Sequence, residues 1–140
     1  MSERAHYQAL KDGARLDGWT LVRIDDGTVT KNPFDFWGFT QQGTVIGLEV
    51  KEDKRKFNIT PGIIPCLLSG YFKGREHQVT WLNEIIDNKG IAIVAVYFIQ
   101  SKEMVLFDAF GRLTNLHKVD GLWRGWYHQE FSDPKPHFTL

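Results

Sequence analysis

The chain has 140 residues, of which 42% are hydrophobic, and its aromatic residues are 10 Phe, 5 Trp and 4 Tyr. This length and composition fit one globular domain, residues 1–140, and exclude a disordered or fibrous protein. Because 17 basic and 17 acidic side chains balance to a formal charge of zero, the chain is not expected to coat nucleic acid through bulk charge. Any phosphate binding must be local.

No membrane or secretory segment is expected. The longest apolar run, residues 91–99, has about half of the roughly 20 residues that a membrane helix needs. The first fifteen residues carry charges and lack the apolar stretch of a signal peptide, so we expect a cytoplasmic protein. The single cysteine, Cys66, excludes an internal disulfide and a multi-cysteine zinc site. Its apolar neighbours predict a buried, inert thiol.

Residues 2–16 are predicted to form a helix, because Tyr7, Leu10 and Ala14 define one apolar stripe. Glu3 lies one turn before Tyr7 on the same face. From the helical pattern alone, Glu3 is a carboxylate favoured by the dipole at a helix start. Residues 19–25 then predict a strand that ends in an Asp-Asp-Gly turn.

A hairpin is predicted next, with strands at 34–40 and 44–52 around a Gln-Gln-Gly loop. A glycine in the last loop position suits the positive φ that such a turn requires. If Thr40 pairs with Thr44, the same register sets Asp35 opposite Glu49, with Cβ atoms roughly 4.5 to 5.5 Å apart. Lys51 shares their face, because strand side chains alternate with a period of two.

The remaining elements complete an α/β pattern. A charged run at 51–56 leads into a loop-like stretch rich in proline and glycine, and residues 75–89 predict a helix stopped by Gly90. Residues 91–99 predict a central strand buried on both faces, and residues 104–110 predict its hairpin partner. This order indicates a mixed sheet with helices and a domain core at about 2–110.

The C-terminal segment, residues 120–140, is rich in aromatic residues. They are Trp123, Trp126, Tyr127, Phe131 and Phe138. Aromatic side chains bury well, so we expect an ordered segment that packs on the domain. Base stacking or a partner surface is the alternative.

The acid pair Asp35 and Glu49 predicts a metal site. Like charges directly opposed on a sheet repel, so something must offset them. Mg²⁺ suits this role because it prefers oxygen ligands and needs only one or two carboxylates with water and phosphate; we expect Mn²⁺ to substitute. The ammonium of Lys51 would then orient a water or stabilise developing negative charge.

These residues carry a family resemblance. Pro33-Phe34-Asp35, thirteen residues and then Glu49-Val50-Lys51 resemble the PD-(D/E)xK nuclease signature, and more closely the RecU-type Holliday junction resolvases. The block Phe-Asp-Phe-Trp-Gly at 34–38, the His-Gln pair at 77–78 and the glycine before the apolar strand also match that family. The resemblance covers roughly residues 30–110.

The resemblance implies a restriction-endonuclease-like mixed β-sheet flanked by helices, in a single domain. It implies that Asp35 and Glu49 are metal ligands and that Lys51 is the catalytic lysine. Glu3 is a further candidate metal ligand and catalytic residue, because a glutamate on the first helix completes the site in similar resolvases. Gln78 would point toward the scissile phosphate, or it is a polar residue at a helix start. His77 is expected to cap the helix or to face solvent.

Basic residues cluster after the second hairpin strand and before the second helix. The candidates for DNA binding are Lys54, Arg55, Lys56, Lys73 and Arg75. Such a patch would neutralise several phosphates and bind in a salt-dependent way. The alternative is a solvated, charged strand end.

The function implied by these observations is a Mg²⁺-dependent endonuclease that resolves four-way (Holliday) junctions by paired phosphodiester hydrolysis. Because a junction has two symmetric strands to cut, we expect a homodimer in which each copy cuts one strand. Two alternatives stay open. One is a nuclease of the same fold that acts on another branched or duplex DNA, and the other is a catalytically silent DNA-binding module.

Overall fold

The computed structural model describes residues 3–24, 35–57, 70–109, 111, 113–126 and 137–138, apart from the side chains of residues 3, 4 and 113. The elements in chain order are η1 (Glu3–His6), α1 (Tyr7–Leu16), β1 (Trp19–Arg23), β2 (Phe36–Thr40), β3 (Val45–Asp53), α3 (Glu76–Asp87), β4 (Ile91–Phe98), β5 (Glu103–Phe107), β6 (Leu113–Val119) and β7 (Leu122–Arg124). In the described part of the chain, no helix is long and apolar enough to cross a membrane.

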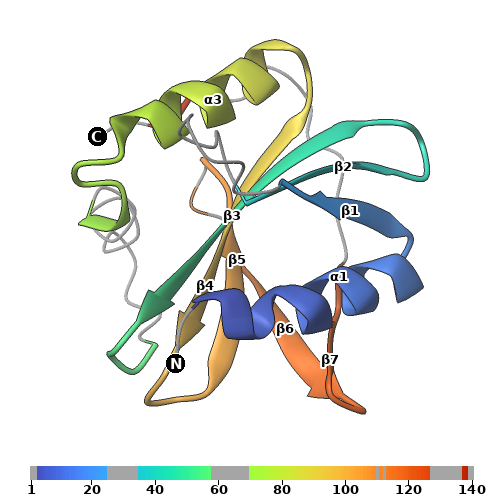
Figure 1. Ribbon diagram of the computed structural model, residues 1–140, viewed down its shortest axis with the longest axis vertical. Helices are drawn as coiled ribbons and strands as arrows, with labels where there is room; N and C mark the ends of the chain where they lie inside the picture. Colours follow the sequence, from blue (N-terminus) through green and yellow to red (C-terminus); the bar gives the residue numbers. More distant parts are fainter. Residues whose placement is uncertain are drawn as a thin grey trace.

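The strands form one mixed sheet in the order β1-β2-β3-β4-β5-β6-β7. All neighbours are antiparallel except β3 and β4, which run parallel. The chain makes this one parallel step by crossing over through α3, since parallel neighbours cannot be joined by a tight turn. The sheet is strongly curled, and α1 and α3 lie on its two sides (Figure 1). The predicted mixed sheet flanked by helices is confirmed.

The central strand β4 separates two hydrophobic clusters. Its residues Ile91, Ile93 and Ala95 face the cluster that contains Leu10 and Ala14 of α1. The alternate residues Ala92, Val94, Val96 and Phe98 face the cluster that contains Val79, Leu82 and Ile86 of α3. A strand covered on both faces has no polar side to present, which explains its continuous apolar sequence.

The predicted elements differ from the structure mainly at their ends. The first turn of the first helix is a 3₁₀ turn, η1, and the α-helix proper begins at Tyr7. The strand predicted at 104–110 extends too far, because β5 stops at Phe107. The turn predicted at 25–27 and Cys66 lie outside the described residues.

Two strands, β6 and β7, were not predicted. They extend the sheet past residue 110, where the sequence placed the end of the core, and they bring Trp123 and Trp126 into the cluster under α1. The expectation that these two aromatic residues pack is therefore confirmed. Tyr127 and Phe131 lie outside the described residues, and Phe138 is buried in the cluster under α3.

Strand β7 is tied to α1. A Cβ atom on Gly13 of α1 would lie 1.8 Å from the backbone oxygen of Trp123, so only glycine permits this approach. Asp17 accepts hydrogen bonds from the Arg124 guanidinium and from the backbone N–H groups of Gly125 and Trp126. These bonds lower the pKa of Asp17 to about 2, the Arg124 bond most. The contact helps to keep the sheet curled around α1.

Candidate active site

The hairpin of β2 and β3 has the predicted register. Phe36 pairs with Leu48 and Phe39 with Val45, and the Thr40 backbone N–H donates to the Thr44 oxygen at 3.0 Å. Gly43 has φ +84°, as the tight loop requires. Asp35 directly precedes β2, and its backbone N–H donates to the Leu48 oxygen at 3.0 Å. The pairing therefore brings Asp35 beside Glu49.

The Asp35 carboxylate is held from two directions. Its Oδ2 accepts the backbone N–H of Val50 at 2.7 Å, where β3 extends past the end of β2. Its Oδ1 accepts the phenol O–H of Tyr7 at 2.9 Å. Burial, followed by the charge and hydrogen bond of Asp35, raises the pKa of the Tyr7 phenol above its ordinary value of 10.0. Tyr7 is therefore a neutral donor at physiological pH.

Glu49 is buried in β3 with 2% of its surface exposed. Burial, and then a hydrogen bond with Asp35 and the charge of Asp35, raise the pKa of the Glu49 carboxyl group far above its ordinary value of 4.5. Its Oε2 is a buried oxygen without a hydrogen-bond partner. Buried polar atoms are nearly always paired, so this oxygen is short of a hydrogen-bond donor or a cation among the described residues.

Lys51 and Gln78 form the third part of the site. Both side chains are 6% exposed, and Lys51 Nζ donates to Gln78 Oε1 at 3.1 Å. Lys51 lies two residues after Glu49 in β3, and Gln78 lies in the first turns of α3. The structure thus shows a hydrogen bond between Lys51 and Gln78. Neither the helix pattern nor the strand pattern alone predicted this contact.

Glu3 lies in η1, one turn before Tyr7, and its side chain lies outside the described residues. Its expected role as a metal ligand therefore stays a prediction. Among the described residues, no group of three or more His, Cys, Asp or Glu side chains is placed to hold a metal ion. The described carboxylates of the site are those of Asp35 and Glu49.

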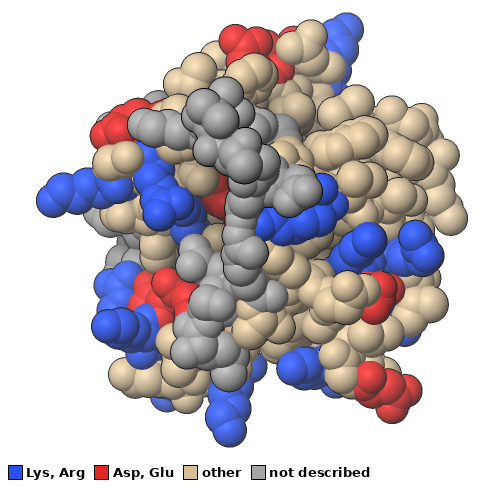
Figure 2. Space-filling view, viewed as in Figure 1, with Lys and Arg blue, Asp and Glu red and all other residues tan. Residues whose placement is uncertain are grey.

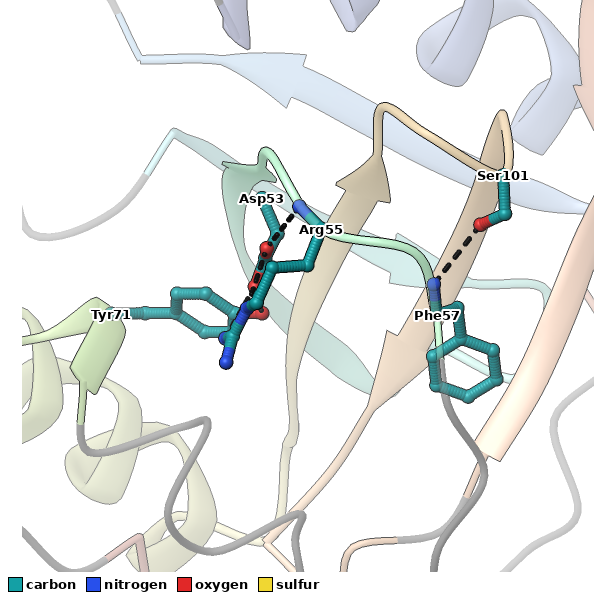
Figure 3. Close-up of polar contacts among 5 residues, drawn as sticks. All are labelled: Asp53, Arg55, Phe57, Tyr71 and Ser101. Atoms are coloured by element: carbon teal, nitrogen blue, oxygen red, sulfur yellow. Dashed lines mark hydrogen bonds and ion pairs between the residues drawn. The ribbon is translucent and has the colours of Figure 1, made fainter.

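A second carboxylate cluster lies at the end of β3 (Figure 3). Asp53 accepts the backbone N–H of Arg55 at 2.8 Å, its Nε at 3.0 Å and its Nη2 at 2.7 Å, and it accepts the Tyr71 phenol at 2.6 Å. The hydrogen bonds from Arg55 are the main reason why the pKa of Asp53 falls to about 2. The Phe57 backbone N–H is anchored nearby on Ser101 Oγ at 3.1 Å.

The predicted DNA-binding residues fall into two groups. Lys54, Arg55 and Lys56 follow β3, Lys73 and Arg75 precede α3, and all five are exposed. Lys and Arg side chains gather in Figure 2 on the side of the molecule where α3 begins. Arg55 forms an ion pair with Asp53, so its charge is partly compensated within the chain.

Sequence reasoning missed Tyr7 and Arg23. The helix stripe predicts a core residue at Tyr7, and its hydroxyl instead reaches a carboxylate 28 residues away. The Arg23 guanidinium lies 4.4 Å from the centre of the Tyr7 ring, and its Nη1 donates to the backbone oxygen of Asp35 at 3.0 Å. The one signal in the sequence was a tyrosine, rather than an aliphatic residue, one turn after Glu3 on the sheet-facing stripe.

No protein-family model and no curated protein matches this chain. Among solved structures, the chain is similar to Hjc of Archaeoglobus fulgidus, a Holliday junction resolvase from an archaeal hyperthermophile. The two share 15% sequence identity with a TM-score of 0.51, and the match covers 86% of this chain and 84% of that chain. At this identity the likeness concerns the fold, which is that of the Hjc nuclease.

Proposed function

We propose that this protein is a Mg²⁺-dependent endonuclease that cuts four-way DNA junctions. The observation that carries the proposal is the buried acid pair Asp35 and Glu49, in which Oε2 of Glu49 has no hydrogen-bond partner among the described residues, with the Lys51 ammonium two residues after Glu49 in β3. The fold shared with an archaeal Holliday junction resolvase supports the substrate class. The motif at 33–51 and the His-Gln pair at 77–78 support the finer proposal of a RecU-type enzyme.

The acid pair fits a divalent cation. Asp35 and Glu49 would hold the ion, because the bare Oε2 of Glu49 is a hard oxygen ligand and a cation would offset both the burial of this carboxyl group and its repulsion by Asp35. We propose Glu3 as a further ligand. Bound Mg²⁺ supplies Lewis-acid stabilisation of the charge on a phosphodiester.

The chain's own groups complete the proposed chemistry. Lys51 has three N–H donors, of which Gln78 accepts one. The others are available to a nucleophilic water or to a phosphate oxygen, where a fixed positive charge stabilises the transition state. Gln78 therefore orients the lysine, and its contact with the scissile phosphate is part of the proposal.

The DNA substrate would lie along the basic residues that follow β3 and those that precede α3. We propose that Lys54, Lys56, Lys73 and Arg75 contact DNA phosphates, together with the N–H groups of Arg55 that Asp53 does not occupy. Such contacts give affinity that falls as the salt concentration rises.

The test compares cleavage of a labelled immobile four-way junction, a Y-shaped fork and a plain duplex, each with Mg²⁺ and with Mn²⁺. We expect nicks at symmetric positions in two opposing strands of the junction and little cutting of the duplex. Equal cleavage of all three substrates would contradict the junction resolvase and indicate a general nuclease. Binding without cleavage by either ion would identify a silent DNA-binding module.

We also propose that two copies act together, because paired cuts in a symmetric junction need two equivalent sites. An apolar strip on β1, β2 and β3 is the surface available for this contact: Val22, Trp37, Phe39 and Val45 are each 36% to 47% exposed. In Figure 2 the surface over β2 shows no Lys, Arg, Asp or Glu side chains, and Lys and Arg side chains lie beside it near β1. The part of the strip on β2 therefore brings no like charges together when two copies meet.

Light scattering tests this pairing. We expect about twice the chain mass of 16.2 kDa, and a Trp37→Glu variant should shift the mass to that of one chain. Trp81→Glu on α3 is the matched control, because Trp81 is also exposed, at 49%. A single-chain mass for the unmodified protein on junction DNA would contradict the homodimer.

A further inference from the structure

Tyr7 is the side chain of α1 that contacts the acid pair. Its O–H donates to Oδ1 of Asp35 at 2.9 Å, while Oδ2 of Asp35 accepts the Val50 backbone N–H at 2.7 Å. Each oxygen of a carboxylate has about two lone pairs. Tyr7 and the Val50 backbone therefore occupy one lone pair on each oxygen of Asp35, and the remaining lone pairs are left for the hydrogen bond with Glu49 and for a cation.

The position of the Tyr7 ring is fixed by its own contacts. The ring packs edge-on against Phe36 with centroids 5.2 Å apart, and the Arg23 guanidinium lies 4.4 Å from the ring centre. Arg23 also donates to the backbone oxygen of Asp35 at 3.0 Å and to the backbone oxygen of Ile24. The ring, the guanidinium and the aspartate thus form one connected network that joins α1 to the start of β2.

We propose that Tyr7 is a positioning residue for the metal site, whose hydroxyl holds the Asp35 carboxylate in the orientation that binds Mg²⁺. The inference rests on the proposed metal-dependent activity. Hydrogen-bond partners of metal ligands typically change metal affinity by about 10 to 100-fold when they are removed. A role in packing alone would need the Tyr7 ring and not its oxygen, so the two roles predict different effects of Tyr7→Phe.

The second tyrosine and aspartate pair supplies a matched control. Tyr71 also donates a phenol O–H to a carboxylate, that of Asp53, at 2.6 Å. Tyr71→Phe removes the same chemical group at Asp53, which Arg55 already neutralises. Both variants keep the aromatic ring, and near-ultraviolet circular dichroism verifies that each is folded.

The experiment measures Mn²⁺ binding to the full chain by electron paramagnetic resonance, together with thermal unfolding without metal. We expect Tyr7→Phe to weaken Mn²⁺ binding about 10-fold and Tyr71→Phe to leave it within about twofold. Cleavage by Tyr7→Phe should approach the rate of the unmodified protein as the Mn²⁺ concentration is raised, since the defect lies in metal affinity.

Two results would overturn the inference, and they have different meanings. If Tyr7→Phe binds Mn²⁺ as tightly as the unmodified protein, the positioning role is wrong and the proposed nuclease stands. If the unmodified protein binds no Mn²⁺, with or without junction DNA, the metal-dependent function fails and the positioning role fails with it.

Discussion

Two tyrosine and aspartate pairs, Tyr71 with Asp53 and Tyr7 with Asp35, differ in the charges around them. Asp53 accepts three N–H groups from Arg55 besides the Tyr71 phenol. Asp35 accepts the Tyr7 phenol and one backbone N–H, and its acidic neighbour is the buried Glu49.

The difference separates a carboxylate whose charge the chain itself compensates from the one that we propose binds metal. Within the cluster at Asp53, the chain supplies all the positive charge that the carboxylate needs, and its pKa falls to about 2. Beside Asp35, the pKa of Glu49 rises instead, mainly through burial. A protein tolerates such an unfavourable arrangement where a ligand later relieves it. This contrast supports the proposal that Asp35, rather than Asp53, belongs to the active site.

Glu49→Gln is expected to have the largest effect. It should abolish Mn²⁺ binding and reduce junction cleavage on the order of 10³-fold, because the amide cannot offer the negative oxygen that a cation needs. Calorimetric titration of Mn²⁺ and single-turnover cleavage measure the two losses. Cleavage near the rate of the unmodified protein would contradict the assignment of the acid pair.

The same variant should stabilise the metal-free protein at pH 7. A raised pKa in the folded state means that the contribution of Glu49 to stability is complete below its ordinary pKa of 4.5 and is lost as the pH rises. Glutamine has no charge to lose, so the advantage of Glu49→Gln should grow from pH 4.5 upward. Urea unfolding at pH 4.5 and pH 7 without metal measures this growth.

Lys51→Met should lower cleavage about 10²-fold and keep Mn²⁺ binding, because the lysine donates to Gln78 and is not a ligand. Single-turnover rates at saturating metal measure the effect, and a gel-shift assay checks that junction binding remains. A variant with full cleavage would leave Lys51 with a role in binding Gln78 only.

Asp53→Asn should cost about 2 kcal/mol of unfolding free energy at pH 7, because it removes charged hydrogen bonds to Arg55 and Tyr71. The pKa of Asp53 is lowered, so its contribution is complete above 3.8 and is lost as the pH falls toward about 2. The stability difference should therefore shrink in acid, as that of Glu49→Gln also does, but the two variants differ in sign: at pH 7 Asp53→Asn destabilises the protein and Glu49→Gln stabilises it.

Asp120→Asn is the control for Asp53→Asn. Asp120 is exposed and has φ +52°, a conformation that asparagine also accepts. Its stability should change by less than about 0.5 kcal/mol. Mn²⁺ affinity should be unchanged in both variants, and a loss in Asp53→Asn would mean that the two carboxylate clusters are coupled.

The smallest effects are expected for exposed lysines near the two clusters. Lys54→Gln and Lys73→Gln should each weaken junction binding several-fold, and each should reduce the slope of log K against log salt by about 0.9 for every phosphate that the variant no longer neutralises. Lys118→Gln on β6 is the control and should leave the slope unchanged. Equal slopes in all three variants would place the DNA on another face.

The hairpin that carries the acid pair could be predicted from the sequence, because its determinants are local. A glycine at the last loop position fixes the turn, and alternation then fixes which residues are opposite. The register found for Phe36 and Leu48 is the predicted one, and it brings Asp35, which directly precedes β2, beside Glu49 although the ladder itself ends at Phe36. The same local reasoning located β4 and α3 to within a few residues.

Strands β6 and β7 could not be predicted in this way. The sequence of β6, Leu-Thr-Asn-Leu-His-Lys-Val, lacks regular alternation, because only parts of this strand face the core. Strand β7 has three residues and is held by α1, through the close approach of Gly13 to Trp123 and the bonds of Asp17. A pattern within seven residues cannot reveal a partner more than 100 residues away.

The sequence by itself determined the sheet register, the acid pair and the lysine beside it, because neighbouring residues and a two-residue period are enough to specify them. Only the tertiary structure decided which distant side chains contact these groups. Gln78 accepts a hydrogen bond from the Lys51 ammonium, and Tyr7 reaches Asp35 across 28 residues. These contacts depend on how α1 and α3 pack on a curled sheet, and the spacing of residues along the chain does not encode that packing.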